Sequence, residues 1–342
     1  MSGIFEMITS TENLFAAWRA FRSGKGERED VTLFERHIED HIFCLQNDLR
    51  TGRYHHGPYH RFLICDPKQR VIHKATVRDR LVHHAVYRVL FPLFDRSFIF
   101  DSYSCRIGKG THAAVRRLEV FVRQVSKNFS GPCWVLKFDV KKFFDSVDHA
   151  ILLGVLARRI PCAETIRLLA VLVGSYEIHT FGGGSFVGQQ QKGKGIPIGN
   201  LTSQLFANVY MDAFDHFIKD ELRIRQYIRY TDDAVIVHRY PDALCHLLPR
   251  IEEWLGEHRR LTLHPRKVEI RKLRQGIDFL GYVVRPYHSV LRTKTKRRMF
   301  RRLNQKNSMS YLGLLTHCEG WKLRKRVVQQ KQEFGKGTDF FT

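Results

Sequence analysis

The sequence predicts an α+β fold in which β-hairpins alternate with amphipathic helices. Residues 234–237 form a short, apolar, β-branched run, and residues 226–230 alternate before it. Together they predict a hairpin with residues 231–233, Thr-Asp-Asp, in its turn. A second apolar strand over residues 134–140 carries Asp139 near its C-terminal end. The predicted architecture is therefore an antiparallel sheet that carries aspartates and is covered by helices.

The first part of the chain is predicted to be mainly helical. Apolar residues at helical spacing indicate helices over residues 1–22 and 31–50, separated by a Ser-Gly-Lys-Gly break. Residues 59–75 predict a hairpin whose turn is Asp66-Pro67-Lys68-Gln69. A further helix begins at Asp79, and another covers about residues 111–127 with Thr111 as its N-cap.

The second part mixes helices and short strands. Helices over 149–159 and 163–173 follow Asp139, and Asp145, Ser146 and Asp148 are expected to cap the first of them. A Gly/Gln-rich hairpin around residues 181–195 leads into an amphipathic helix. After the Asp-Asp hairpin we expect a helix over 241–258, a strand pair within 261–270 and one strand over 279–284.

Composition points to a polyanionic partner. The 342 residues carry a formal net charge of +23, with a pI near 10.0 and 43% hydrophobic residues. Nucleic acid is the leading partner for such a charge, and an anionic membrane surface is the alternative. No apolar run approaches the roughly 18 residues of a membrane span. The absence of a signal-peptide pattern and of Cys-x-x-Cys spacing among seven cysteines favours a reducing, cytoplasmic location.

The three aspartates predict a metal site. If the two strands bring Asp139 beside Asp232 and Asp233, their oxygens form the kind of cage that hard divalent cations prefer. Two such ions about 3.5–4 Å apart support in-line nucleotidyl transfer. The alternative is two unrelated groups of aspartates at strand ends, since Asp-Asp also occurs in ordinary turns.

Two basic segments are candidate nucleic-acid contacts. The loop that holds Arg106 and Lys109 contains Gly-Lys-Gly-Thr but lacks the first glycine and the preceding strand of a phosphate-binding loop. It is either a loop on a template backbone or a solvated turn. From residue 292 the chain is strongly basic with interleaved apolar residues, which predicts helices on a phosphate backbone or, alternatively, a disordered tail.

Five motifs, in order between about residues 60 and 285, resemble the sequence blocks of reverse transcriptases. They are Phe138-Asp139-Val140-Lys141-Lys142-Phe143-Phe144, Ile198-Gly199-Asn200-Leu201-Thr202-Ser203-Gln204, Tyr230-Thr231-Asp232-Asp233, Leu263-His264-Pro265-Arg266-Lys267 and Phe279-Leu280-Gly281-Tyr282. The resemblance implies an RNA-directed DNA polymerase with a right-hand fold. Its parts would be an N-terminal helical segment (1–58), fingers (59–133), a palm (134–285, with a finger insertion at about 150–197) and a basic thumb (286–342).

The second motif resembles one subclass in particular. Most reverse transcriptases begin it with Gln-Gly and contain Ser-Pro, whereas here Ile198 replaces the Gln and Gln204 replaces the Pro. This variant is similar to the reverse transcriptases of diversity-generating retroelements in bacteria and phages. The resemblance implies copying of a template-repeat RNA into cDNA with errors opposite adenine, assisted by a small oligomeric accessory variability protein.

The resemblance also implies roles for single residues. Two Mg²⁺ ions, or Mn²⁺ in their place, would be held by Asp139, Asp232, Asp233 and the Val140 carbonyl, with Asp233 contributing least. Contacts to the incoming dNTP would come from Lys68, Arg70, Phe144 as the sugar gate, Ile198, Gly199, and Lys267 as a proton donor to pyrophosphate. Contacts to template and primer would come from Ser203, Gln204, Arg106, Lys109, Leu280, Gly281 and Tyr282.

Two other functions stay open from the sequence. The chain could be another bacterial reverse transcriptase, such as a retron, group II-like or phage-defence enzyme. It could also be a non-catalytic RNA-binding protein on the same fold, although three intact carboxylates argue against this.

Overall fold

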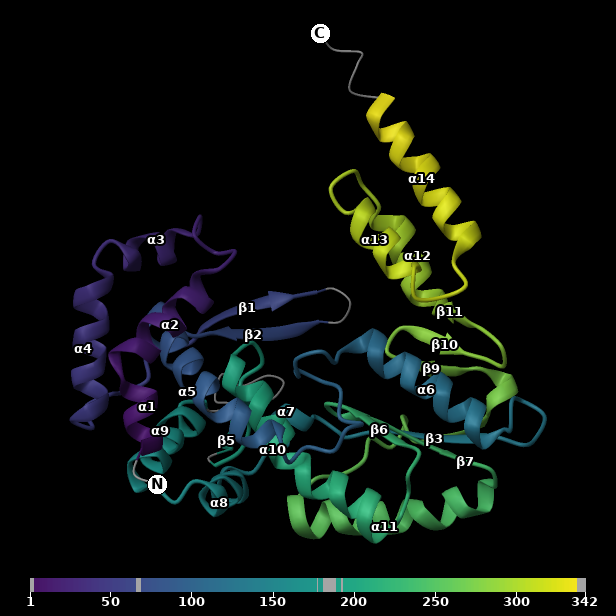
Figure 1. Ribbon diagram of the computed structural model, residues 1–342, viewed down its shortest axis with the longest axis horizontal. Coiled ribbons are helices and arrows are strands. Elements are labelled where there is room, and N and C mark those ends of the chain that lie inside the picture. Colours follow the sequence, from purple (N-terminus) through teal and green to yellow (C-terminus); the bar gives the residue numbers. More distant parts are fainter. Residues whose placement is uncertain (1–2, 66–68, 177, 181–188, 192, 337–342) are drawn as a thin grey trace. The chain divides into compact units, whose positions relative to one another are not determined.

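The structure is a computed structural model that describes residues 3–65, 69–176, 178–180, 189–191 and 193–336 (Figure 1). The chain folds into two compact units, each assembled from three separate segments. The first unit comprises Met1–Phe100, Val140–Leu222 and Ile251–Leu263, and the second comprises Asp101–Asp139, Arg223–Arg250 and His264–Thr342. Each is described in turn.

The first unit opens with five helices, where the sequence predicted three. They are α1 (Gly3–Thr9), α2 (Thr11–Arg22), α3 (Glu29–Glu35), α4 (Ile38–Arg50) and α5 (Val77–Asp95). The helix expected over 1–22 breaks at Ser10, which has extended backbone angles and caps α2 by accepting from the Asn13 N–H. The helix expected over 31–50 breaks near His37, whose φ of −126° and ψ of 42° are not helical. Helix α2 packs on α5.

The predicted hairpin at 59–75 is confirmed as strands β1 (His60–Ile64) and β2 (Arg70–Lys74). They are antiparallel, and Phe62 lies opposite Ile72. A second hairpin pairs β4 (Ile178–Thr180) with β5 (Gln189–Gln191). Strand β5 lies within the predicted Gly/Gln-rich segment, and β4 lies just before it. Both hairpins belong to the first unit.

The rest of the first unit is helical. The short α7 (Phe143–Ser146) precedes α8 (His149–Arg159) and α9 (Ala163–Gly174), and α10 (Leu201–His216) continues into the π-helical turn η1 (Phe217–Glu221). Asp148 caps α8 by accepting from the Ile151 N–H at 3.1 Å, as predicted. Helix α10 packs on α5 and on α8. Helix α11 (Pro241–Arg259) belongs to the second unit up to Arg250 and to the first unit from Ile251, and it matches the helix predicted at 241–258.

The second unit is built around an antiparallel sheet of four strands. Its order is β6 (Tyr227–Tyr230), β7 (Asp233–His238), β3 (Trp134–Asp139) and β8 (Glu269–Lys272). The predicted Asp-Asp hairpin is confirmed as β6–β7, except that Asp233 is the first residue of β7 rather than part of the turn. Helix α6 (Thr111–Val125) packs on β6 and β7. Its N-cap is Gly110, not Thr111, whose hydroxyl instead donates to the Tyr230 hydroxyl at 3.3 Å.

Two predicted strand assignments were wrong because pairing partners come from distant segments. Residues 261–270 do not pair with each other: Leu263 bridges Val140, and β8 pairs with β3. Residues 279–284 are two strands, β9 (Ile277–Phe279) and β10 (Tyr282–Val284), in a sheet of order β11-β10-β9 with β11 (Ser289–Leu291). The chain turns between β9 and β10 at Leu280 and Gly281, both with positive φ. The 3₁₀ turn η2 (Leu273–Gln275) precedes β9.

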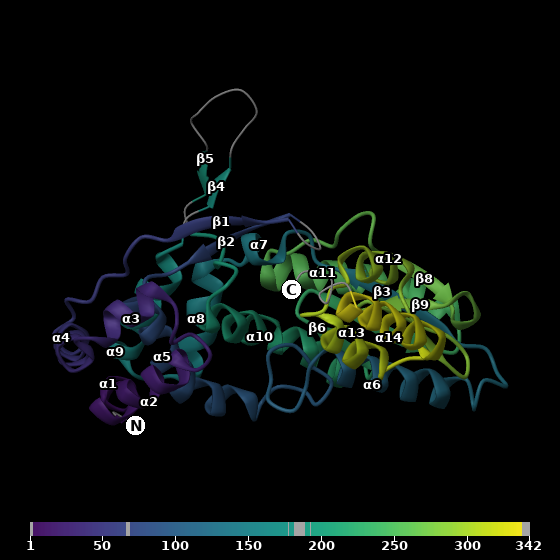
Figure 2. The same ribbon diagram turned by 90° about the horizontal axis from the view of Figure 1, so that it is seen from above.

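The basic C-terminal segment contains three helices between residues 293 and 336. It forms α12 (Thr293–Arg302), α13 (Ser308–Leu315) and α14 (Trp321–Lys336), of which α13 and α14 lie side by side (Figure 2). Met299, Leu315 and Val327 of these helices join one buried core with Leu118 of α6 and Val235 of β7. The prediction of helices is therefore confirmed over these residues, and the disordered-tail alternative is excluded for them.

Candidate active site

Three carboxylates gather at one end of the four-stranded sheet. Asp139 ends β3 and lies directly opposite Asp233, the first residue of β7. Asp232 precedes Asp233 in the β6–β7 turn. The strands form because their inner residues, such as Phe138 and Val235, are fully buried β-formers. The sheet therefore brings together the three aspartates that the sequence predicted to meet.

The pKa of the Asp232 carboxyl reflects its burial and the two neighbouring carboxylates. Burial raises it from 3.8 to about 6, and the negative charges of Asp139 and Asp233 add to the effect. The pKa of Asp233 is also raised, first by burial, although nearby Lys137 opposes the shift. The cluster therefore holds more negative charge than its surroundings stabilise.

Two lysines partly neutralise this cluster. The Lys267 ammonium lies 2.8 Å from each carboxylate oxygen of Asp139. The Lys137 ammonium lies 3.8 Å from Asp233 Oδ1 and donates to the Asp278 carbonyl at 2.9 Å. The structure thus places Lys267 against Asp139, where the sequence reasoning had expected only a position near the leaving pyrophosphate.

The oxygen donors suit a hard divalent cation, because carboxylates with raised pKa values gain most from a positive charge. The bridge between Val140 and Leu263 uses the Asp139 carbonyl and the Lys141 N–H, so it leaves the Val140 carbonyl oxygen unused. Among the described residues, however, no three His, Cys, Asp or Glu side chains are already arranged to hold a metal ion. The donor chemistry fits a metal, and in this arrangement Lys267 takes both oxygens of Asp139.

The turn that carries Asp232 is braced by an earlier segment of the second unit. Thr231 has a φ of +57°, a strained value for a β-branched residue. Its hydroxyl donates to Ser104 Oγ at 2.6 Å. The fully buried Arg229 donates to the Thr231 carbonyl at 3.1 Å and to Ser102 Oγ at 3.2 Å. The sequence reasoning missed this brace, and a lone Arg inside an apolar strand was its only local signal.

The other residues of the second unit that were predicted to contact nucleic acid interact mostly with residues of their own loops. Arg106 donates to the Ser102 carbonyl at 3.1 Å, and Lys109 lies 5.0 Å from the centre of the Tyr103 ring. Tyr282 is 1% exposed and donates to the Leu314 carbonyl at 3.0 Å. Tyr282 is therefore the buried member of the three candidate primer contacts, whereas the turn residues Leu280 and Gly281 are half-buried.

In the first unit, Phe143 is a core residue at 1% exposure, whereas Phe144 is half-buried, as a residue that touches substrate would be. Arg70 is exposed at the start of β2, and Lys68 lies outside the described residues. Ser203 is buried and Gln204 is exposed. Of these two candidate template contacts, Gln204 is therefore the accessible one.

Ile198 and Gly199 form a fixed turn before α10. The Ile198 carbonyl accepts from the His73 N–H of β2 at 3.3 Å. Gly199 has a φ of +120°, and a Cβ added there would lie 3.0 Å from Ile72 Cγ2. A side chain at position 199 would therefore be strained and crowded, which explains the glycine.

Comparison with known proteins decides the family. Residues 65–284, which include all three aspartates, match the reverse transcriptase (RNA-dependent DNA polymerase) family. The chain belongs to this family. Its enzyme class, an RNA-directed DNA polymerase, is therefore as predicted.

Similar curated proteins include intron-encoded proteins. This reverse transcriptase is 23% identical to protein YkfC of Escherichia coli over 94% of its own chain and 92% of that protein. It is 26% identical to the group II intron-encoded protein LtrA of Lactococcus lactis over 53% of its own chain and 28% of that protein. It is 25% identical to the putative COX1/OXI3 intron 1 protein of Saccharomyces cerevisiae over 65% and 26%, respectively. The chain thus spans about a quarter of the two intron proteins.

Solved structures confirm the predicted fold class. An apo telomerase from Candida tropicalis, truncated from its C-terminal domain, has a TM-score of 0.50 at 12% identity and covers 72% of this chain and 59% of that one. A second apo telomerase from this organism has a TM-score of 0.50 at 13% identity, with coverage of 76% and 52%. At such identities the likeness shows the fold alone.

Among the described residues of the reverse transcriptase, no helix is long and apolar enough to cross a membrane.

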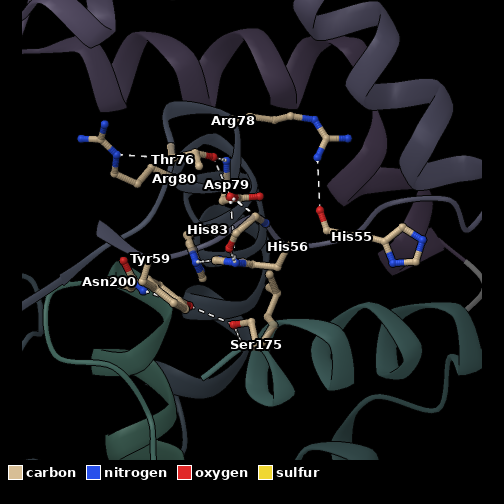
Figure 3. A network of polar contacts seen from close by, with 12 residues as sticks. His55, His56, Tyr59, Thr76, Arg78, Asp79, Arg80, His83, Ser175 and Asn200 are labelled. Atoms are coloured by element: carbon tan, nitrogen blue, oxygen red, sulfur yellow. Dashed lines mark hydrogen bonds and ion pairs between the residues drawn. The ribbon is translucent and has the colours of Figure 1, made fainter. Parts of the chain in front are cut away.

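A polar network in the first unit was not foreseen from the sequence (Figure 3). His83 is 2% exposed, and burial, followed by the charges of His56 and His84, lowers its pKa to about 3. Its Nδ1 is 2.7 Å from the Thr202 hydroxyl, and its Nε2 is 3.3 Å from His56 Nε2. Since His56 Nδ1 must donate to the Gly57 carbonyl at 2.6 Å, neutral rings fit a chain in which Thr202 donates to His83 and His83 donates to His56.

Proposed function

We propose that this reverse transcriptase copies the template-repeat RNA of a diversity-generating retroelement into cDNA, with errors opposite template adenine. The observation that carries the proposal is the motif before and within α10, in which Ile198 and Gln204 stand where most family members have Gln and Pro. Its partners would be the template-repeat RNA, the cDNA, dNTPs and an accessory variability protein. The bacterial or phage origin and cytoplasmic location belong to the same proposal.

The polymerase site in this proposal is the carboxylate cluster of the second unit. Asp139, Asp232, Asp233 and the Val140 carbonyl would hold two Mg²⁺ ions. When bound, such ions lower the pKa of a primer hydroxyl and neutralise the phosphate charge that develops during transfer. The raised pKa values of Asp232 and Asp233 support the proposal, because a cation would relieve their repulsion.

Lys267 would change partner during the reaction. It holds both oxygens of Asp139 in this structure, and a divalent cation on Asp139 would release its ammonium. A released ammonium can donate a hydrogen bond and then a proton to the leaving pyrophosphate. Lys267 would thus act as counter-ion first and as general acid afterwards.

Substrate selection would fall to residues of the first unit. Phe144 is the proposed sugar gate, since a ring beneath the sugar would clash with a 2′-hydroxyl. Lys68 and Arg70 are the proposed triphosphate contacts, with Arg70 preferred because a guanidinium binds phosphate through two hydrogen bonds. Gln204 and Ser203, Arg106 and Lys109, and Leu280, Gly281 and Tyr282 remain proposed contacts to template and primer. The division into N-terminal segment, fingers, palm and thumb remains a proposal as well.

Ile198 would lower copying fidelity. A Gln at this position could donate hydrogen bonds to the nascent base pair, and Ile cannot. Losing such a contact weakens selection by about 1–3 kcal/mol, or roughly 5–150-fold. Because the backbone turn at Ile198 is held by β2, Ile198→Gln changes the side chain without moving the turn.

The test is Mg²⁺-dependent extension of a primed RNA, with the products sequenced. Errors enriched opposite adenine, and reduced in Ile198→Gln, would support the mutagenic subclass. An unchanged error spectrum in that variant would refute the role of Ile198. Asp232→Asn should abolish synthesis and preserve RNA binding, and retained synthesis would refute the metal site.

A second candidate is an accurate reverse transcriptase of the group II intron type. The similarity to the group II intron-encoded protein LtrA favours it. Accurate products from the wild-type enzyme would select this candidate. They would leave the polymerase assignment intact.

A further inference from the structure

The hairpin β9–β10 of the second unit ends in a tight turn of two residues. Phe279 pairs with Tyr282, so the turn consists of Leu280 and Gly281. Both have positive φ, 49° and 93°, as the tightest class of hairpin turn requires. The turn therefore has little freedom relative to its own strands, and its place in the unit depends on what holds the hairpin.

Lys137 connects this hairpin to the carboxylate cluster. It lies on the inner strand β3, two residues before Asp139 and on the same face. Its ammonium donates to the carbonyl of Asp278 in β9 at 2.9 Å and lies 3.8 Å from Asp233 Oδ1. The side chain is only 17% exposed. Because a nearly buried ammonium is costly unless it is paired, its place between a β7 carboxylate and a β9 carbonyl indicates a specific task.

Arg292 holds the same hairpin from another side. Its guanidinium pairs with the carboxylate of Asp278, the residue whose carbonyl Lys137 contacts. Its backbone N–H donates to the Gly281 carbonyl at 2.9 Å. Asp278 therefore receives one cation on its carbonyl and another on its carboxylate, and Arg292 joins that residue to the turn.

The carboxylates and the turn belong to two different sheets of the second unit. At the end of β3 away from Asp139, the Leu273 N–H donates to the Cys133 carbonyl at 3.0 Å and joins the segment before β9 to the segment before β3. The bond from Lys137 to Asp278 joins the hairpin to β3 closer to Asp139. This spacing matters for catalysis, because reacting atoms must approach to about 3–3.5 Å before they react.

We propose that Lys137 is a positioning residue that holds the β9–β10 turn, and with it the primer end, at a fixed place relative to Asp233. Asp278 and Arg292 complete the connection to the turn. Lys137 acts through the hairpin and touches neither primer nor nucleotide. The inference rests on the proposed function in taking this turn to contact the primer.

The first measurement follows the primer end without synthesis. A primer that carries 2-aminopurine as its 3′-terminal base is annealed to an RNA template and bound by saturating enzyme, in EDTA and without dNTP. Stacking quenches 2-aminopurine, so its fluorescence reports how the terminal base is held. Lys137→Met and Arg292→Met should both change the intensity of the bound primer, in the same direction.

Two control variants remove the same charges elsewhere in the second unit. Lys272→Met changes an exposed lysine that lies opposite Trp134, at the other end of the sheet. Arg274→Met changes an exposed arginine of η2. Both should keep the wild-type signal. Thermal unfolding checks that each variant is folded, and the 35% exposed Arg292 keeps the test available if Lys137→Met does not fold.

The second measurement is incorporation of a single nucleotide. Lys137→Met should lower kcat by about 10–100-fold with little change in KM for dNTP, because a displacement of about 1 Å can cost this much. Lys137→Arg, which can still donate to the Asp278 carbonyl, should recover most of the loss. The double variant of Lys137→Met and Arg292→Met should be little worse than Lys137→Met, since both remove one connection. Losses that multiply would overturn the connection.

A counter-ion role for Lys137 gives a different result. If Lys137 only offsets the charge of Asp233, Lys137→Met lowers kcat but leaves the 2-aminopurine signal in EDTA at its wild-type value, and the inference is wrong.

Leu280→Ala tests the primer contact itself. A signal that this variant leaves unchanged would overturn the primer contact, which is part of the proposed function, and the inference with it. A signal changed by Leu280→Ala but not by Lys137→Met would overturn the inference alone.

Discussion

Asp232→Asn should stabilise the protein at neutral pH in the absence of metal. Burial, then the charges of Asp139 and Asp233, raises the pKa of the Asp232 carboxyl from 3.8 to about 6. Because the pKa of Asp232 is higher in the folded state, the unfolded chain releases the carboxyl proton at a lower pH than the folded protein does. The free energy of unfolding therefore falls as pH rises. The shift of roughly two units corresponds to about 3 kcal/mol. Solvent screening of this half-buried side chain reduces the expected gain to about 1–2 kcal/mol.

The assay is thermal unfolding in EDTA across a pH series. The gain of the variant over wild type should be absent below pH 3.8, grow up to about pH 6 and stay constant above it. For a domain of this size it corresponds to roughly 2–4 °C in Tm for each kcal/mol. Asp242→Asn, which removes an exposed first-turn acid of α11, should instead be neutral or slightly destabilising.

Added Mg²⁺ gives the complementary result. A cation that binds only the folded state stabilises it in proportion to occupancy. Mg²⁺ should therefore raise the Tm of wild type and leave that of Asp232→Asn nearly unchanged. A variant less stable than wild type in EDTA at neutral pH would refute the electrostatic reasoning, and an equal response to Mg²⁺ would refute Asp232 as a ligand.

Three further changes test other parts of the structure. Phe144→Ala should raise ribonucleotide incorporation about tenfold in primer extension, and unchanged sugar selection would exclude it as the gate. Arg229→Met should cost about 3 kcal/mol in urea unfolding through lost buried hydrogen bonds, whereas exposed Arg274→Met should have little effect. Asp148→Ala should cost about 1–2 kcal/mol through its lost cap. Burial raises the pKa of Asp148, but hydrogen bonds lower it by more, so the pKa lies below the usual 3.8. The stability difference between wild type and Asp148→Ala should therefore disappear as pH falls below 3.8.

The meeting of the aspartates could be predicted because its signals are local. The six residues of β3 and the hairpin β6–β7 are apolar runs bounded by polar residues, so the positions of Asp139 and Asp232 follow from strand ends alone. The breaks at Ser10 and His37 could not be predicted in this way. Apolar spacing continues across both breaks, and only the backbone angles show where each helix ends.

Features that depend on contacts between distant segments also could not be predicted from the sequence. Leu263 pairs with Val140, and local alternation does not encode that choice of partner. One pocket of the first unit is lined by Lys25, Lys74 and Asn200, which come from three segments of the chain. In a chain with 57 lysines and arginines, neither lysine is distinctive until the fold brings them together.

The order of strands in the four-stranded sheet has a consequence for synthesis of the protein. Strand β3 lies in the middle, but its neighbours β7 and β8 begin only at Asp233 and Glu269. On the ribosome, both edges of β3 therefore stay unpaired while the segment Val140–Leu222 of the first unit is synthesised. Unpaired apolar edges are prone to aggregate. A nascent chain that stalls before β8 should consequently need chaperone protection, and no fragment ending there can assemble the complete sheet.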